Sequence, residues 1–149
     1  MRFFSAWLPR LLLSLFLVLP AAAVLAQQNA AGPRLILKGY DPVAYFTVGR
    51  PVQGSPEYKH DWDGGRYYFS SAANRDKFAA DPERFAPQFG GYCTGSMSRG
   101  VRAEAHPEGW IISDGKLYVF GQAKFRDIAL TDPQWLAMRV PKASENWKQ

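Results

Sequence analysis

Two stretches of the chain alternate hydrophobic and polar residues with the period of a β-strand. In EYKHDWDGGRYYFSS, Tyr58, His60 and Trp62 fall on one face of a strand, because successive side chains of a strand point to opposite faces. An Asp-Gly-Gly sequence at 63–65 follows, and glycine reaches the positive φ of a tight turn without steric cost. GWIISDGKLYVFG repeats this arrangement around an Asp-Gly turn at 114–115. Each stretch therefore predicts an antiparallel β-hairpin.

Helix starts are marked by residues that cap helices, in three places followed directly by proline, one of them Asp81-Pro82. Asp41 and Asp132 each precede a proline, and Ser71 precedes the helix-forming run AANRDKFAAD. Pro141 is expected to interrupt the last helix soon after it begins. Strands and helices are mixed without the alternation of a parallel sheet. The predicted fold class is therefore α+β, a small single domain of antiparallel β-hairpins packed with short helices.

The N-terminus has the pattern of a secretory signal peptide. Residues 1–26 combine arginines, a short apolar run and a Val-x-Ala site ending at Ala26, and the apolar run is shorter than a membrane span. We expect cleavage there, export to a bacterial periplasm, and no membrane anchor afterwards. Residues 27–36 are polar and small and are interpreted as a flexible linker, which leaves residues 37–149 as one domain.

The charges of the chain are spread along it rather than gathered in a block. It has 18 Lys and Arg against 13 Asp and Glu, a formal net charge of +5. Basic residues are scattered among acidic ones with no basic block, so nucleic acid is not an expected partner. The expected partner is a small ligand or another protein of the cell envelope, and the protein is expected to be a monomer.

Several motifs together resemble the YHS domain family. YDPVAYF, WDGGRYYFSSAANRDKFAADPERF, GGYC and DGKLYVF carry this resemblance, which is closest to the exported single-domain proteins of the family. It implies a YHS/TRASH-like module, with relatives that bind metal through three cysteines. Ala44, Ser70 and Asn74 stand at those positions here. Because none of the three is a good ligand for Cu(I) or Zn(II), we expect that this chain keeps the scaffold without the usual metal site.

Cys93, in QFGGYCTGSMSRG, is the only cysteine of the chain. The resemblance implies that GGYC is kept in the exported branch, and that some relatives carry selenocysteine, which we expect at this position. Gly90 and Gly91 are expected to bend the backbone so that Cys93 begins a short helix, which would favour a thiolate. Arg99 or Arg102 could add positive charge. We therefore expect a partly accessible sulfur.

Two sets of residues are candidates for a site around this cysteine. A metal site, with copper as the possible cofactor, would use Cys93, Met97 and His60, because thiolate and thioether sulfur favour Cu(I). Whether His60 reaches Cys93 is left open by the sequence. A small-ligand site would use the aromatic residues together with the cysteine: Cys93, Tyr92, Tyr40, Tyr45 and Trp62.

Two functions follow from these candidates. The first is a non-enzymatic binding module for a copper-like metal ion or a small ligand around Cys93. The alternative is a thiol redox protein in which Cys93 is the catalytic residue and reacts as a thiolate. The chain has no second cysteine to form a disulfide with it, and no motif that marks a catalytic base. The binding module is therefore the preferred interpretation.

Overall fold

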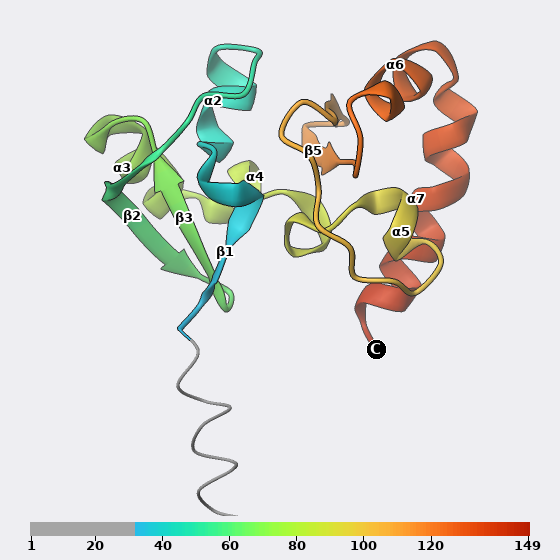
Figure 1. Cartoon of the computed structure of the whole chain (residues 1–149), viewed down its shortest axis with the longest axis horizontal. Helices are drawn as coiled ribbons and strands as arrows, with labels where there is room; N and C mark the ends of the chain where they lie inside the picture. Colours follow the sequence, from blue (N-terminus) through green and yellow to red (C-terminus); the bar gives the residue numbers. More distant parts are fainter. Residues whose placement is uncertain (1–31) are drawn as a thin grey trace, which may run out of the picture. The chain divides into compact units, whose positions relative to one another are not determined.

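The computed structural model describes residues 32–149 and contains both predicted hairpins (Figure 1). β2 (Ser55–Trp62) and β3 (Gly65–Phe69) pair antiparallel, with Trp62 opposite Gly65. The turn between them has positive φ at Asp63 and Gly64, +46° and +70°, as a two-residue hairpin turn requires. β1 (Arg34–Leu35) adds to β3 in parallel, giving the strand order β1-β3-β2. The first predicted hairpin is confirmed.

Short helices cover this first sheet, and each begins at the residue that caps it. α2 (Pro42–Thr47) is capped by Asp41, α3 (Ala72–Ala80) by Ser71, and α4 (Pro82–Phe85) by Asp81. Each capping side chain accepts hydrogen bonds from backbone N–H groups that have no partner inside the helix. A 3₁₀ segment, η1 (Ile36–Gly39), connects β1 to α2.

The second half of the domain holds the other predicted hairpin. β4 (Trp110–Ser113) and β5 (Lys116–Val119) pair antiparallel around Asp114 and Gly115, both at positive φ. The chain reaches them through η2 (Gln88–Gly91) and α5 (Thr94–Met97). It continues into α6 (Lys124–Thr131) and α7 (Pro133–Trp147), the long helix that ends near the C-terminus in Figure 1. The α+β fold class is confirmed.

The boundary between the predicted linker and the domain differs from the sequence-based expectation. The domain begins before residue 37, because β1 pairs with β3 from Arg34 and Ile36 is buried. The predicted linker at 27–36 is therefore too long at its C-terminal end. The signal peptide predicted at 1–26 and the first linker residues lie outside the described residues.

Pro141 does not interrupt the last helix, which continues for six residues beyond it to Trp147. Proline removes one helical hydrogen bond and crowds the preceding turn, but packing on both sides holds the helix together. Leu136 before the proline and Ala143 after it are both buried in the same hydrophobic cluster. No helix among residues 32–149 is long and apolar enough to cross a bilayer.

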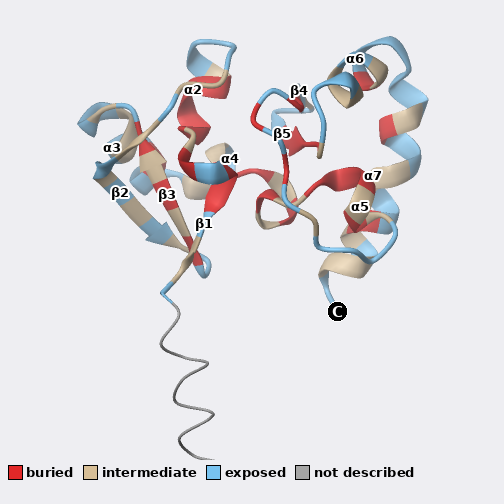
Figure 2. Ribbon diagram, viewed as in Figure 1, coloured by how far each residue is buried: buried red, intermediate tan, exposed pale blue. Residues whose placement is uncertain are grey.

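The buried residues, drawn red in Figure 2, form two clusters, and the first of them joins residues of both sheets, such as Phe69 on β3 and Leu117 on β5. In the first cluster Phe78 from α3 contacts the rings of Tyr67 and Phe69 on β3, with ring centroids 4.6 and 5.2 Å away. In the second, Phe120 packs edge-on against Trp135 at 5.4 Å. A candidate site residue that packs in one cluster is held apart from those that pack in the other.

Candidate functional site

The backbone before Cys93 bends sharply, as expected from its glycines. Gly90 and Gly91 adopt φ values of +58° and +77°, and Phe89 joins them at +56° although it is not a glycine. Cys93 then stands directly before α5, where its carbonyl accepts the backbone N–H groups of Ser96 and Met97 at 3.0 and 2.8 Å. The cysteine is therefore held by the backbone at the start of a one-turn helix.

The side chain of Cys93 is buried, with 5% of its surface exposed, so the expectation of a partly accessible sulfur is wrong. The reason is that Phe89 and Cys93 belong to the second hydrophobic cluster, together with β5 and α7 residues. The Sγ atom lies against two glycines. Cβ atoms placed on Gly95 and Gly121 would be 3.9 and 3.7 Å from it. Small residues on both sides thus leave room beside the sulfur.

That room is a pocket of about 320 Å³, which we call the Cys93 pocket. Two of its lining residues are cationic, Arg99 after α5 and Arg139 on α7. Arg139 donates to the carbonyl oxygen of Trp135 at 2.9 Å, and its guanidinium lies 4.0 Å from the centroid of that indole. Phe125 stacks on the same indole at 5.8 Å. The remaining lining residues are small, polar or aromatic: Gly95, Ser96, Phe120, Gly121 and Gln122.

The proposed metal ligands are not brought together. Met97 lies in the same cluster as Cys93 but is 1% exposed and does not line the Cys93 pocket. His60 packs edge-on against Phe78 of the first cluster, with centroids 5.8 Å apart. Within the part of the chain that the structure describes, no three His, Cys, Asp or Glu side chains are grouped to hold a metal ion.

The three positions at which the sequence lacks cysteines do converge, on the buried carboxylate of Asp41. Oδ1 accepts the backbone N–H groups of Val43 and Ala44 at 2.9 and 3.3 Å. Oδ2 accepts the N–H and hydroxyl of Ser70 at 2.9 and 2.6 Å and the Asn74 amide at 2.7 Å. Ser70 and Asn74 therefore donate hydrogen bonds here, and a fully bonded carboxylate occupies the centre of the group.

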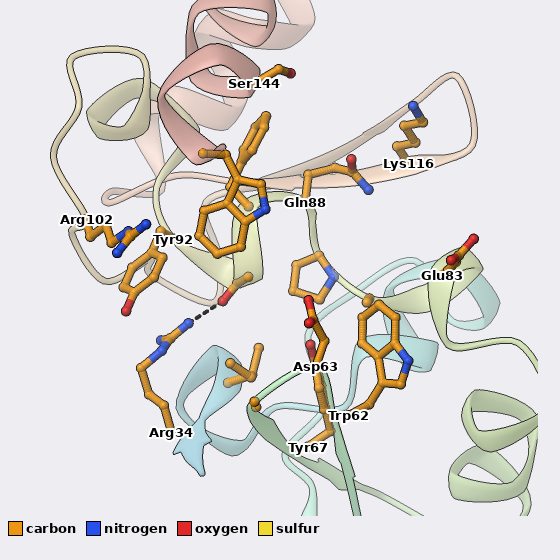
Figure 3. A pocket seen from close by; sticks show the side chains of 18 of the residues that line it. Arg34, Trp62, Asp63, Tyr67, Glu83, Gln88, Tyr92, Arg102, Lys116 and Ser144 are labelled. Carbon is orange, nitrogen blue, oxygen red and sulfur yellow. Dashed lines mark hydrogen bonds between the residues drawn. The ribbon is translucent and has the colours of Figure 1, made fainter. Parts of the chain in front are cut away.

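The aromatic candidates are divided among three places. Tyr45 is 1% exposed, donates its hydroxyl to the carbonyl oxygen of Pro107 at 3.1 Å, and packs against Trp110, so it is a core residue. Tyr40 packs at the edge of the first cluster. Trp62 and Tyr92 line a different and larger cleft, shown in Figure 3, which Cys93 does not reach. The five residues predicted for one ligand site thus do not form a single site.

Two buried tyrosines are expected to make the stability of the fold depend on pH in the alkaline range. Burial, reinforced by the charge of Asp63, raises the pKa of Tyr67 from 10.0 to about 12, and burial together with Glu108 raises the pKa of Tyr45 as well. The unfolded chain releases these protons near pH 10, whereas the folded protein keeps them. We therefore expect the free energy of unfolding to fall as the pH rises from about 10 toward 12.

Urea unfolding across this pH range, with tyrosinate absorbance followed in parallel, measures the effect. Tyr67→Phe should be as stable as the parent at pH 8 and lose less stability above pH 10. A free energy of unfolding that stays constant through this range would contradict the expectation.

The sequence did not reveal most of the Cys93 pocket. Arg99 was expected as a nearby positive charge, but Arg139, Phe125 and Trp135 come from a segment more than 30 residues further along the chain. The only local signal was the spacing of Trp135 and Arg139, which places them on one face of a helix.

Comparison with known families gives a match for only part of the chain. Residues 43–89 match the family model described as the YHS domain. No curated protein and no solved structure gave a match. The matched segment includes Ala44, Ser70 and Asn74 and ends four residues before Cys93. The Cys93 pocket is therefore built by residues outside the matched segment.

Proposed function

Because residues 43–89 of this chain form a YHS domain, we propose that the protein is an exported binding module that uses its C-terminal half to hold a small anionic ligand in the Cys93 pocket. The leader pattern of residues 1–26 supports export to the periplasm. One observation carries the choice of ligand. Arg99 and Arg139 line the pocket beside Cys93, and no carboxylate lines it among the described residues.

The charges of the pocket favour an anion over copper. Two guanidinium groups repel a cation, and neither Met97 nor His60 lines the pocket to complete a Cu(I) site with the cysteine. Arginine instead binds carboxylates and oxyanions through paired N–H donors. Of the two ligands that the sequence suggested, a small molecule and a copper ion, we therefore propose the small molecule. Copper binding is the competing outcome.

Each part of the pocket would have a separate task. Arg139 is oriented by its contacts with Trp135, so little side-chain freedom is lost when it binds an anion. Phe125 and Trp135 supply an apolar wall. A pocket of about 320 Å³ lies at the small end of ligand sites, which favours a small ligand beside the Cys93 thiol.

Binding of acetate, malonate and inorganic phosphate, each compared with neutral acetamide, tests the proposal by NMR titration of the purified protein. At least one anion should shift the backbone signals of residues 93–99 and 121–125, and acetamide should not. Arg139→Gln should weaken that binding by about tenfold, the usual effect of losing one charge-assisted hydrogen bond. Arg75→Gln is the matched control, because Arg75 is paired with Asp76 on exposed α3.

Two outcomes would replace the proposal. Stoichiometric Cu(I) binding that Cys93→Ser abolishes would establish the copper site instead. The redox alternative is separated by alkylation of Cys93. A binding module with a buried thiol predicts slow labelling that a bound anion slows further, whereas fast labelling at neutral pH, unchanged by anions, would favour thiol chemistry.

A further inference from the structure

A second cleft, apart from the Cys93 pocket, lies between the first hairpin and the end of the last helix. Its volume is about 720 Å³, and it is lined by Trp62 at the end of β2 and Trp147 at the end of α7, so we call it the tryptophan cleft (Figure 3). No residue of the Cys93 pocket lines it. Its size is within the range of sites for small organic ligands.

The aromatic walls of this cleft are held in place by close packing. Trp147 lies so near the backbone of Gly90 that a Cβ there would be 2.8 Å from the indole ring, and Gly90 has a φ of +58°. Tyr92 packs beside Trp147 with centroids 6.3 Å apart. Trp62 packs edge-on against Phe78 at 6.2 Å. Both indoles are half-buried and line the open space between them.

Positive charge exceeds negative charge along the cleft. Arg34, Arg102, Lys116 and Lys148 line it, against the carboxylates of two residues, Asp63 and Glu83. Arg34 is bonded to Glu104, donates to the Gly90 carbonyl and lies over the Tyr92 ring. Arg102 stacks over Trp147 at 5.4 Å, and no carboxylate among residues 32–149 lies within ion-pair distance of it. Figure 3 shows Arg34, Tyr92 and Arg102 together on one side of the cleft.

One hydroxyl of the cleft lining has no hydrogen-bond partner among the described residues. Tyr67 is 2% exposed as a whole residue and lines the cleft, and no hydrogen bond joins its hydroxyl to another residue among 32–149. Burial raises the pKa of Tyr67, the charge of Asp63 raises it further, and the charge of Arg34 lowers it. A hydroxyl in a cleft wall without a protein partner is free to bond water or a ligand. At neutral pH this hydroxyl is protonated and can donate to an anion.

We propose that the tryptophan cleft binds a planar aromatic anion. Its ring would pack against Trp147 and Trp62, and its anionic group would lie on the Arg34 and Arg102 side, within reach of the Tyr67 hydroxyl. Flat aromatic walls favour a ring over an aliphatic chain, because offset and edge-on ring contacts stabilise such pairs beyond the area they bury. The excess of cations selects an anion over a neutral ring or a sugar.

Naphthalene-2-carboxylate is a suitable probe, with calorimetry of the full mature protein as the measurement. Naphthalene-2-carboxamide has the same ring without the charge, and cyclohexanecarboxylate has the charge without the flat ring. The carboxylate should bind at millimolar concentration or below, and each matched compound should bind at least about tenfold more weakly. The affinity for the carboxylate should also fall as salt is added.

Single substitutions locate the binding. Arg102→Gln should weaken binding of the naphthoate by about tenfold, and Tyr67→Phe by several-fold without lowering the melting temperature, because its hydroxyl has no protein partner to lose. Arg126→Gln is the control, since Arg126 lies over Trp110 and does not line the cleft. Arg139→Gln should leave this binding unchanged, which separates it from the Cys93 pocket. Equal binding of the amide, no binding of the carboxylate, or full affinity in both cleft variants would each overturn the proposal.

Discussion

Asp41→Asn should lower the free energy of unfolding by about 3 kcal/mol, because it places an amide where five donors need an acceptor. The carboxylate of Asp41 is fully buried and accepts from the backbone of Val43 and Ala44 on one oxygen, and from Ser70 and Asn74 on the other. It thereby joins the start of α2 to the junction between β3 and α3. Few single side chains in this domain connect as many elements.

Neither orientation of an asparagine can reproduce these bonds. If the amide nitrogen faces Val43 and Ala44, it meets two backbone N–H donors. If it faces Ser70 and Asn74, it meets three donors, including the Asn74 amide at a position now 2.7 Å from oxygen. Donors that face donors are left without partners in a buried place, which costs more than losing a bond that water can replace.

Thermal and urea unfolding measure this effect, with an expected fall in melting temperature of roughly 10 °C. Asp76→Asn provides the matched control, because Asp76 is an exposed carboxylate on α3 whose pairing with Arg75 is open to solvent. It should leave the melting temperature unchanged. A similar melting temperature for Asp41→Asn and the parent would show that the buried network does not stabilise the fold.

Phe78→Ala should be at least as damaging, with an expected loss of about 4 kcal/mol. Phe78 is completely buried and is the one residue of α3 that is buried. Its ring contacts Tyr67 and Phe69 on β3 and His60 and Trp62 on β2. Removing it leaves a cavity between α3 and the sheet, and the surrounding side chains can close only part of the space.

The same unfolding measurements apply, together with two comparison variants. Phe78→Leu should lose less, because it fills part of the cavity, and Lys77→Ala should be neutral, because Lys77 is exposed on the same helix. The order Ala, then Leu, then parent tests whether packing volume is the cause. Equal losses for the Leu and Ala variants would instead assign the effect to the aromatic contacts themselves.

The elements that sequence reasoning located correctly are those set by short-range chemistry. The hairpins follow from alternating side chains and from Asp-Gly turns whose positive φ glycine accepts. The caps at Asp41, Ser71 and Asp132 follow from side chains that bond backbone groups only two or three residues away. The bend at Gly90 and Gly91 belongs to the same class. Each of these features is complete within a few residues, so the pattern of residues predicts it.

The errors all involve partners that are distant along the chain. Pro141 was expected to end a helix on local grounds, but the buried residues around it keep α7 continuous. The composition of residues 27–36 predicts a linker that ends at residue 36, although β1 pairs with a strand about 30 residues later. The residues next to Pro141 and next to the start of β1 carry no local pattern that indicates these long-range contacts.

By itself, the sequence determined the α+β class, the two hairpins and the single thiol, because each depends on composition or on neighbours along the chain. Only the tertiary structure decided what surrounds that thiol. It packs His60 against Phe78 of the first cluster and Cys93 into the second, and it brings Arg139 from α7 to the pocket beside the sulfur. It also brings Trp62 and Trp147, 85 residues apart, to one cleft. The physical reason is that a site is made by packing between elements, and packing depends on which buried faces fit together across the whole domain.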